Sequence, residues 1–516
     1  MKIISAQAMR ELDALTIKRA GVTSRELMHV AGVGVAKEIL SYLEKFIYKL
    51  HVKRFVILAG KGNNGGDGYV VADYLAQHTK IPVVIFPICS RQELGGEAAY
   101  YADKLSREVN VLLKELVASD DFRTGDIIID GLLGTGFSGA IKHPYKKWIE
   151  TVNSSGYPVI SIDIPSGMDG TTGDVLDMAI IADLTVTIGL PKRGLFIKDG
   201  PAHVGLLKVV DIGIPSEFVA KINSNLDLFN EEGAEKLLLR ISNDSHKKSV
   251  GTVLIIGGSK CYRGAPILSG MAALRSGAGL VTVAVPKLCA PSSLPYNALI
   301  IREIGNNNDV FFNSSSISEL SELIKSHDAI VVGPGIGMSH FAEEVVRTVL
   351  SHDKKIIIDA DALNLISSNP DILKRNERFI FTPHIGEMMR LLVAFGKDVN
   401  FSEDRISKVE KATKLLGGTI VLKGNKTIVS HSGKALSINN TGSQALATAG
   451  TGDVLSGIIG AFASSSLDGF DASRISVYIH GLAGELVQKK NGVRGTIADD
   501  IIEAIPEALR IISPFA

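Results

Sequence analysis

The sequence predicts an α/β protein of two domains, each with a parallel sheet covered by helices. The chain has 516 residues, which is too long for one ordinary hydrophobic core. Short apolar runs of strand length recur along it, separated by segments with helical patterns. Many of the 52 glycines directly follow such runs. Strand, glycine-rich loop and helix is the order in which α/β proteins build phosphate sites.

Composition and charge narrow the functional classes. Hydrophobic residues make up 45% of the chain and charged residues 21%, which is typical of a soluble globular protein. The formal net charge is +0, so no overall basic field attracts nucleic acid or an anionic membrane, and we expect neither as a partner. The three cysteines, Cys89, Cys261 and Cys289, are far apart and odd in number. They argue against a disulfide framework and favour a cytoplasmic protein.

No stretch of the sequence has the pattern of a secretory signal or a membrane span. Charged residues such as Arg10 and Asp13 interrupt the segment from Met1 to Ala20, where a secretory signal would be continuously apolar. The chain lacks the run of about 18 apolar residues that a spanning helix needs. The most apolar stretch, Val454 to Ala463, is interrupted by Ser456 and two glycines, and we expect it to be a buried helix.

The first domain is predicted over residues 1–222 as a parallel sheet with helices on both faces. Its apolar segments are continuous and do not alternate, which is typical of strands buried on both sides. After the first strand we expect a loop rich in glycine and asparagine, and then a helix from Val70 to Gln77. The predicted strands are Phe55 to Ala59, Val83 to Phe86, Ile127 to Asp130, Val159 to Ile164 and Leu184 to Ile188.

The character of the sequence changes between about Ile214 and Lys248, where asparagine and serine interrupt the hydrophobic pattern. We therefore place the boundary near residue 222 and assign residues 223–516 to the second domain. Strands and helices alternate again there. The predicted strands are Thr252 to Ile256, Leu280 to Val285, Ala329 to Val332, Ile356 to Asp359 and Ile420 to Leu422, and the predicted helices include Ala265 to Ser276 and Phe341 to Leu350.

Three loops at strand ends indicate a site in the first domain. They are GKGNNGGDG from Gly60, GLLGTGFSG directly after Asp130, and DIPSG from Asp163. Glycines let the backbone approach a phosphate closely, and a helix N-terminus favours the anion. In an open parallel sheet all three loops emerge at the ligand-binding edge. Each aspartate alone is explained about as well by helix capping, but three such loops together favour a ligand site.

These loops resemble those of the NAD(P)H-hydrate epimerase family, over about residues 1–215. The resemblance implies a Rossmann-like three-layer fold that binds the hydrated dinucleotides NADHX and NADPHX. It implies that Asp163 is catalytic and that a potassium ion is bound by Asn64, Asp130 and Ser166. The substrate-binding residues that it implies are Asn63, Asn64, Gly65, Gly66, Asp67, Gly134, Thr135, Gly136, Phe137, Ser138, Gly139, Ala140 and Asp163.

The epimerisation is plausible chemistry for these residues. The hydrated ring carries a hydroxyl on the carbon next to N1, and the N1 lone pair can help to expel it. An iminium-like cation remains, and water can return to either face of the ring. Asp163 would stabilise that cation and move the proton.

The strongest signal in the second domain is the stretch AGTGDVLSG from Ala449, which is expected to open a helix. Backbone N–H groups of the glycine-rich turn can form an anion hole, to which the helix dipole adds. Asp453 then lies where it can take a proton from an attacking hydroxyl. A helix cap is the alternative, but the two glycines that flank Thr451 exceed what a cap needs.

This turn resembles the ribokinase-like superfamily. The stretches VGPGIG, DADALN, TPHIGEM, YRGA and KGNKT narrow the resemblance to ADP/ATP-dependent NAD(P)H-hydrate dehydratase, over about residues 228–512. The resemblance implies that Asp453 is catalytic. The residues that it places against the hydrate are Ala265, Gly337, His384 and Asp453, and those against the nucleotide are Lys423, Gly424, Asn425, Lys426, Thr427 and Gly452.

Two features of the second domain also have a simpler, purely structural explanation. His384 taken without the resemblance is better explained as a loop histidine with satisfied hydrogen bonds. The pair Asp359 and Asp361 looks like a metal site, but one of the two can equally cap a turn. The HEXXH and CxxC metal patterns are absent from the sequence.

The dehydration mechanism follows from the poor leaving ability of hydroxide. Phosphorylation of the ring hydroxyl makes it a good leaving group, with Asp453 activating the hydroxyl and the Gly450 to Gly452 backbone neutralising the phosphoryl group. Loss of phosphate and of a ring proton restores the dihydropyridine. Mg²⁺ is expected to accompany ADP or ATP in such a transfer.

Two other functions compete with this interpretation. The second domain could be a small-molecule kinase, such as a vitamin-precursor kinase, but TPHIGE and the fused first domain argue against it. The first domain could be a non-catalytic dinucleotide sensor, against which the Asp163 loop argues. We expect ADP as the donor, because fused members of the family resemble prokaryotic enzymes that use it, and we expect a homo-oligomer.

Overall fold

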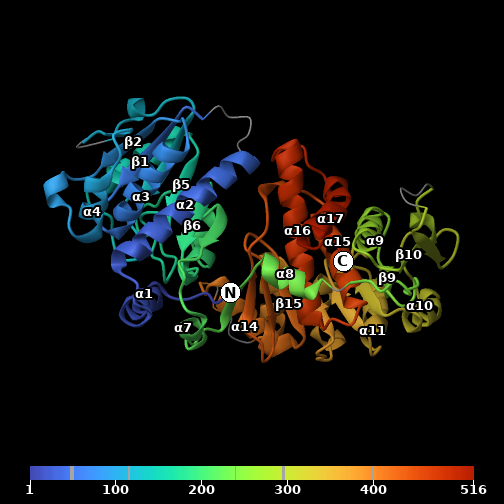
Figure 1. The fold of residues 1–516 in the computed structure, drawn as a ribbon. Coiled ribbons are helices and arrows are strands. Elements are labelled where there is room, and N and C mark those ends of the chain that lie inside the picture. Colours follow the sequence, from blue (N-terminus) through green and yellow to red (C-terminus); the bar gives the residue numbers. More distant parts are fainter. Residues whose placement is uncertain are drawn as a thin grey trace. The chain divides into compact units, whose positions relative to one another are not determined.

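The computed structural model describes residues 1–46, 52–113, 117–238, 240–292, 297–396, 400 and 402–515. Within them the chain forms two compact units, residues 1–226 and 227–516. The division falls just after the position near residue 222 that the change in sequence character indicates. Figure 1 shows the chain coloured from blue at the N-terminus to red at the C-terminus.

Unit 1 (residues 1–226) contains a seven-stranded sheet in the order β3-β2-β1-β4-β5-β6-β7, and all of its strands run parallel. The strands are β1 Arg54–Ala59, β2 Val83–Pro87, β3 Val109–Val111, β4 Asp126–Gly131, β5 Val159–Ile162, β6 Leu184–Ile188 and β7 Leu206–Val210. The helices are α1 Ala6–Ala20, α2 Ser24–Phe46, α3 Asn63–His78, α4 Gly96–Lys104, α5 Tyr145–Ser155, α6 Gly200–His203 and α7 Ser216–Ala220.

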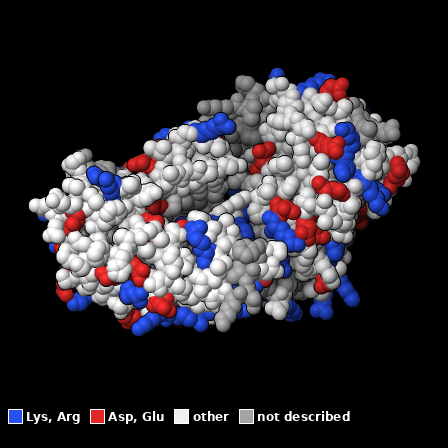
Figure 2. Space-filling view, turned by 180° about the vertical axis from the view of Figure 1, so that it is seen from behind, with Lys and Arg blue, Asp and Glu red and all other residues white. Residues whose placement is uncertain are grey.

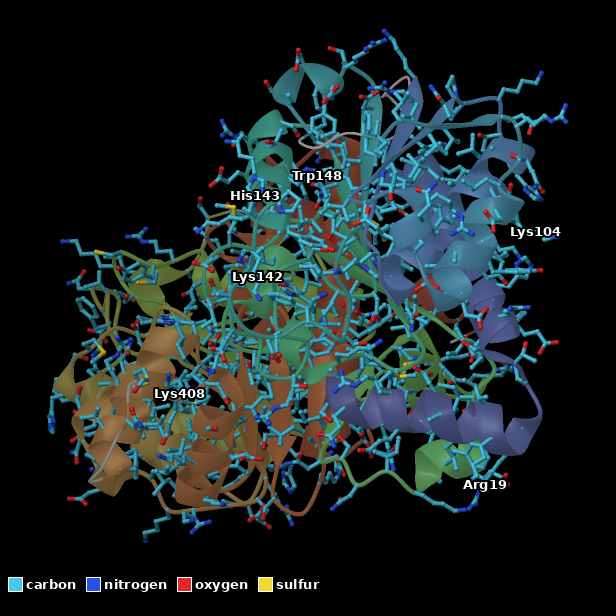
Figure 3. All side chains as sticks on the ribbon, turned by 90° about the vertical axis from the view of Figure 1, so that its left-hand side faces the viewer. Arg19, Lys104, Lys142, His143, Trp148 and Lys408 are labelled. Carbon is cyan, nitrogen blue, oxygen red and sulfur yellow. The ribbon has the colours of Figure 1, made fainter. Side chains whose placement is uncertain are left out.

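The core of unit 1 lies on both faces of this sheet, as the continuous apolar strands predict. Phe55 and Ile57 of β1 pack into one cluster with residues of α2 and α3. Val56 and Leu58 point to the opposite face and pack into a second cluster with Trp148 of α5, which is labelled in Figure 3. The predicted parallel sheet with helices on both faces is therefore confirmed.

Unit 2 (residues 227–516) is built on a ten-stranded sheet in the order β11-β10-β9-β12-β13-β14-β15-β16-β17-β8, parallel from β11 to β15 and antiparallel at β16 and β17. The strands are β8 Leu226–Phe229, β9 Thr252–Ile256, β10 Leu280–Pro286, β11 Ile300–Ile304, β12 Ala329–Val332, β13 Lys355–Ile358, β14 Phe379–Phe381, β15 Thr419–Leu422, β16 Ile428–His431 and β17 Leu436–Asn439.

The helices of unit 2 follow the strands along the chain. They are α8 Glu231–Leu237, α9 Ala265–Arg275, α10 Ser316–Lys325, α11 His340–Leu350, α12 Asp361–Ser368, α13 Ile385–Phe395, α14 Arg405–Leu416, α15 Thr451–Ala463, α16 Gly469–Asn491 and α17 Ala498–Ile512. The predicted buried helix from Val454 to Ala463 is part of α15, whose residues pack into one core with α9, α16 and α17.

Charge is evenly distributed over the face drawn in Figure 2, where acidic and basic side chains are interspersed among uncharged ones. This agrees with the formal net charge of +0. Within the described part of the chain, no helix combines the length and the hydropathy that a membrane span requires.

Candidate active sites

The first glycine-rich stretch of unit 1 differs from its prediction, because α3 begins at Asn63 and not at Val70. The residues predicted as a loop therefore form the first turns of a helix. Close packing explains why glycine stands inside it. A Cβ on Gly65 would lie 1.8 Å from the Gly60 carbonyl oxygen, and one on Gly66 would lie 2.7 Å from the Met28 sulfur. The helix end can thus approach the sheet edge and present its N–H groups there.

Asn64, Asp130 and Ser166, the predicted potassium ligands, come together in one buried network. Asn64 Nδ2 donates to the Leu133 carbonyl at 3.0 Å, and Ser166 Oγ lies 3.2 Å from the same oxygen. Ser166 also donates to Asp130 through Oγ at 2.5 Å and through its backbone N–H at 2.9 Å. Burial raises the pKa of Asp130, and its hydrogen bonds with Ser166 oppose that rise.

The second glycine-rich loop packs against the site at its beginning, whereas its far end does not. A Cβ on Gly134 would lie 3.2 Å from the Asn64 Cβ, so this end of the loop packs against α3. Arg10 of α1 donates to the Thr135 carbonyl at 2.5 Å. From Ser138 to Ala140 the loop is exposed to solvent. The structure therefore joins Gly134 and Thr135 to the site and leaves the far end of the loop open.

Asp163 lies at the end of β5 in a strained position. The strand stops at Ile162, two residues before the predicted end, because Asp163 has a φ of 65°, which non-glycine residues rarely adopt. Its carboxylate is buried. Asp163 Oδ1 accepts from the Ile188 N–H at 3.1 Å, from Thr187 Oγ1 at 3.2 Å and from Lys192 Nζ at 2.5 Å.

Lys192 is a site residue that the sequence analysis missed. It is only 1% exposed, and besides Asp163 its Nζ donates to the Ile188 carbonyl at 2.6 Å and to Thr187 Oγ1 at 3.2 Å. The available signal was the loop GLPKRG after the predicted strand that ends at Ile188. It follows a strand as the other site loops do, but a single lysine in it matches no recognised pattern.

Two further carboxylic acids interact electrostatically with the ion pair of Asp163 and Lys192. Asp67 of α3 is buried, and burial together with the charges of Asp163 and Asp13 raises its pKa well above its usual range, against the opposing effect of Lys192. Burial raises the pKa of Asp13, on α1, to about 6. The Oδ1 atom of Asp13 is enclosed and has no hydrogen-bond partner among the described residues. Asp13 was not predicted as a site residue.

In unit 2 the predicted turn does open a helix. Gly450 is the N-cap of α15 with a φ of 88°, a conformation that favours glycine, and Asp453 lies in the first turn. Burial raises the pKa of Asp453 to about 7, the carboxylates of Asp359 and Asp361 add to this, and Lys423 opposes it. A carboxylate whose pKa lies near neutral pH is suited to general-base catalysis.

Asp359 is the centre of the hydrogen bonds in this second site. It follows β13 and is 1% exposed. It accepts from Thr382 Oγ1 at 2.7 Å, from Lys423 Nζ at 2.8 Å and from Ser456 Oγ at 2.9 Å. Because Lys423 directly follows β15 and Ser456 lies on α15, this carboxylate ties two strand ends to the helix that carries Asp453. Of the acidic pair Asp359 and Asp361, Asp359 thus forms an ion pair with Lys423.

His384, which was predicted to contact the hydrate, makes a structural contact at the start of α13. Its Nδ1 accepts from the Gly386 N–H at 3.0 Å and so caps α13, and its Nε2 lies 3.4 Å from Glu387 Oε1. Glu387 is buried, burial raises its pKa, and it lies 4.0 Å from Lys423 Nζ. Glu387 lies within the motif TPHIGEM, but its position there predicts no role for it.

Ala265, the first residue of α9, lies close to the loop that contains Gly337. A Cβ on Gly335 would lie 3.4 Å from the Ala265 Cβ. The Gly337 N–H donates to Asp361 Oδ2 at 2.9 Å. Asp361 therefore orients a loop, which accounts for the second member of the acidic pair.

The predicted nucleotide-binding stretch begins at Lys423 beside the glycine-rich turn. A Cβ on Gly452 would lie 3.6 Å from Lys423 Nζ, so the amine faces the backbone of the anion hole. Arg405 of α14 donates through Nη1 to the Asn425 carbonyl. Its Nη2 atom is enclosed without a partner among the described residues, and burial lowers the pKa of Arg405. Arg405 was not predicted.

Among the residues that the structure describes, neither site contains a cluster of metal-binding side chains of the usual kind. Over the described ranges of the chain, no group of three or more histidine, cysteine, aspartate or glutamate residues is arranged to hold a metal ion. The hydroxyl and amide oxygens of the Asn64, Asp130 and Ser166 network are outside that class of ligand.

Two family models match the chain, one in each unit. Residues 24–194 match the model described as YjeF-related protein N-terminus. Residues 253–507 match the model described as NAD(P)H-hydrate dehydratase.

Curated relatives match over nearly the whole chain. The bifunctional NAD(P)H-hydrate repair enzyme Nnr of Coxiella burnetii is 34% identical over 494 residues, which cover 96% of either chain. The enzyme of the same name from Moorella thermoacetica is 32% identical over 519 residues, 99% of this chain and 97% of that one. The one from Archaeoglobus fulgidus is 34% identical over 510 residues, 99% of either chain.

Solved structures are similar to part of the chain. An ADP/ATP-dependent NAD(P)H-hydrate dehydratase from Bacillus subtilis, co-crystallised with ATP and Mg²⁺, has a TM-score of 0.47 and 27% identity, and the match covers 56% of this chain and 99% of that one. A ribokinase-like superfamily protein from Enterococcus faecalis has a TM-score of 0.48 and 26% identity, covering 56% and 98%.

Proposed function

The chain belongs to the family of bifunctional NAD(P)H-hydrate repair enzymes, and from this premise we propose which site performs each reaction. Unit 1 interconverts the R and S epimers of hydrated NADH and NADPH. Unit 2 dehydrates the S epimer to NADH or NADPH by phosphoryl transfer. The observation that carries the proposal is Asp453, which has a pKa of about 7 and lies at the N-terminal end of a helix beside Lys423.

In unit 1, the N1 lone pair of the hydrated ring and the anionic Asp163 act together. As the C–O bond to the ring hydroxyl breaks, positive charge develops on the ring, and the carboxylate held by Lys192 and the Ile188 N–H stabilises it. Water then returns to either face. The dinucleotide is held by residues 63–67 at the start of α3 and by residues 134–140 of the second loop.

In unit 2, Asp453 takes the proton of the ring hydroxyl as that oxygen attacks the terminal phosphoryl group of the nucleotide. The Gly450 to Gly452 backbone and Lys423 stabilise the negative charge of the transferring group. Phosphate then leaves with the former hydroxyl oxygen, and loss of a ring proton restores the dihydropyridine. We place Ala265, Gly337 and His384 against the hydrate.

The nucleotide is assigned to residues 423–427 and Gly452, with ADP as the preferred donor. The backbone of this stretch turns sharply, with a φ of 144° at Gly424 and 55° at Lys426. Arg405 donates a hydrogen bond to the Asn425 carbonyl and so supports this turn. When bound with the nucleotide, Mg²⁺ would neutralise phosphate charge, as in other phosphoryl transfers.

We propose a potassium ion at the network of Asn64, Asp130 and Ser166, with backbone carbonyls completing its shell. The donor set fits such an ion, because it combines one carboxylate with the neutral oxygens of Ser166 and the Leu133 carbonyl, which lie 3.2 Å apart, and with the amide of Asn64, whose Nδ2 donates to that carbonyl. Mg²⁺ would instead demand a tight octahedron and keep its waters. The test is anomalous scattering from crystals exchanged into thallium. A peak beside these three residues is expected, and density without a peak there would leave them as loop scaffolding.

The test of the whole proposal is incubation of the purified chain with mixed-epimer NADH hydrate and ADP or ATP, following the absorbance of reduced nicotinamide. Complete recovery of NADH is expected with ADP, and more slowly with ATP. A small-molecule kinase would consume nucleotide without forming NADH. If unit 1 were only a sensor, just the S fraction would be recovered rapidly. The homo-oligomeric state and cytoplasmic location stay predictions that this assay does not address.

A further inference from the structure

The epimerase site gathers three carboxylic acids around one lysine, and this grouping goes beyond the residues assigned so far. Asp13 comes from α1, Asp67 from α3, Asp163 follows β5 and Lys192 follows β6. Each of the three acids influences the others or the lysine electrostatically. One lysine cannot balance the buried carboxylates of Asp67 and Asp163 together with the half-buried one of Asp13, so part of the group must carry protons at neutral pH.

Geometry decides which acid the lysine stabilises as an anion. Lys192 Nζ lies 2.5 Å from Asp163 Oδ1, and the same oxygen accepts from the Ile188 N–H and from Thr187. Three donors to one oxygen fix an ionised carboxylate. Asp67 has no such contact with Lys192. It is buried beside Asp163, where a second negative charge would be repelled.

Resting on the epimerase function proposed above, we propose that Lys192 divides these acids into two roles. Asp163 is the fixed anion that stabilises the ring cation, and Asp67 is a neutral carboxylic acid that exchanges its proton with the ring hydroxyl. Lys192 is a positioning residue, because it acts through Asp163. Asp13 adds a third acid whose enclosed oxygen has no partner among the described residues, and it discourages ionisation of Asp67.

The step balances with these groups alone. The C–O bond to the ring hydroxyl breaks, the N1 lone pair forms a C=N bond, and the departing oxygen takes the proton of Asp67 to leave as water. The positive charge of the cation is then offset by two carboxylates, those of Asp163 and Asp67. Water adds to the other face of the ring, the C=N electrons return to N1, and the proton released by that water restores Asp67. No electron leaves or enters the ring system.

The groups that face Asp67 predict how its proton responds to pH. Asp163 and Asp13 disfavour a negative charge on Asp67, whereas Lys192 favours it. Burial is the largest cause of the raised pKa of Asp67. An acid that must stay protonated makes epimerisation fall as pH rises through its pKa.

The first experiment compares the Asp67→Asn variant with the full-length wild-type chain. Asparagine keeps the size of the side chain but has no proton to exchange. We expect epimerisation of R-NADH hydrate to fall by about 10²-fold or more, with dehydration of the S epimer unchanged. The matched control is Asp103→Asn on α4, which removes an acid paired with Arg91 at the surface and should leave both rates unchanged. Wild-type epimerisation by Asp67→Asn would overturn the proposal.

A second measurement needs no turnover and so separates this proposal from the epimerase assignment itself. Infrared difference spectra of wild type and Asp67→Asn at pH 7 should show the loss of a protonated carboxyl band. If the wild-type chain fails to epimerise, the proposed function falls, yet the band still reports the charge state of Asp67. Absence of any lost band at pH 7 would show that Asp67 is ionised, and the division of roles would be wrong.

The third measurement tests Lys192 through the Lys192→Met variant. Without the lysine, the positive charge that lowers the pKa of Asp67 is gone, so the alkaline limb of the epimerisation pH profile should move to higher pH. A purely structural role would lower the rate equally at every pH. An unchanged profile in a folded variant would therefore contradict the positioning role. If this variant does not fold, Asp67→Asn and its infrared spectrum still decide the proposal.

Discussion

The two units build their sites from the same pair of residues, an aspartate and a lysine, and use the pair differently. In unit 1, Lys192 lies 2.5 Å from Asp163, the acid assigned to the chemistry. In unit 2, Lys423 lies 2.8 Å from Asp359, which is a neighbour of the catalytic acid. Lys423 influences Asp453 through space and does not prevent its pKa from rising to about 7.

This difference shows that the position of one lysine ammonium group determines whether a nearby carboxylate acts as a fixed anion or as a base. An aspartate paired directly with a lysine remains an anion and suits the stabilisation of a positively charged intermediate. An aspartate in a half-buried turn, whose neighbouring lysine is paired with another aspartate, becomes a base near neutral pH. Epimerisation needs the first kind of group and phosphoryl transfer needs the second.

Among the variants that test this difference between the two sites, Asp453→Asn should have the largest effect. Loss of a general base should cut dehydration of the S epimer by roughly 10²–10⁴-fold while nucleotide binding is kept. The measurement is the rate of NADH formation at saturating ADP, with ADP affinity determined by calorimetry as the control. Turnover near the wild-type rate would remove Asp453 from the mechanism.

The next largest effect is selective, and it comes from Asp163→Ala. Epimerisation should be lost while the favoured epimer is still dehydrated, because the other site is intact. A mixed-epimer substrate should then react in two phases, a rapid one for the S fraction and a slow one set by spontaneous epimerisation. Consumption of both epimers at the wild-type rate, after correction for the spontaneous reaction, would show that the epimerase site lies elsewhere.

A smaller effect concerns stability, and Asp453→Asn should increase it. The pKa of Asp453 is raised from 3.8 to about 7, so the folded state binds the proton more tightly than the unfolded chain. The acid therefore favours the fold below about pH 4, and this contribution is lost as pH rises to about 7. Asparagine avoids that loss, and we expect a gain on the order of 2–4 kcal/mol at pH 8 and less at pH 5.

Thermal or denaturant unfolding of both proteins at the two pH values measures this gain. Comparing the variant with wild type at each pH cancels the other titrating groups. A gain of the same size at pH 5 and pH 8 would mean that the ionisation of Asp453 is not its source.

Much of the fold could be predicted from the sequence, because strand cores and turn glycines leave local patterns. Continuous apolar runs such as Val83 to Phe86 located the parallel strands, and GTGD located the start of α15. The start of α3 was misplaced. Its glycines looked like loop residues, yet they permit contacts such as that of Gly65 with the Gly60 carbonyl, which depend on the folded chain.

The residues that the sequence could nominate for the sites are those that lie in recognisable motifs. Asp163 and Asp453 do, whereas Lys192, Asp13 and Arg405 are single polar residues without a local pattern. What marks them is burial, which arises from distant segments: α1 brings Asp13 to loops that follow β5 and β6. The shared role of Asp359 likewise depends on three elements meeting at one carboxylate.

The measurement that tests the contrast between the two sites most directly is the pH dependence of kcat/KM for both reactions in one preparation. Dehydration of the S epimer requires ionised Asp453, so it should fall as pH drops below about 7. Epimerisation of the R epimer, corrected for the spontaneous reaction, requires protonated Asp67 and should persist there but fall on the alkaline side. Opposite limbs are the predicted result. Two profiles that rise and fall together would contradict the assignment of different roles to the two aspartate–lysine pairs.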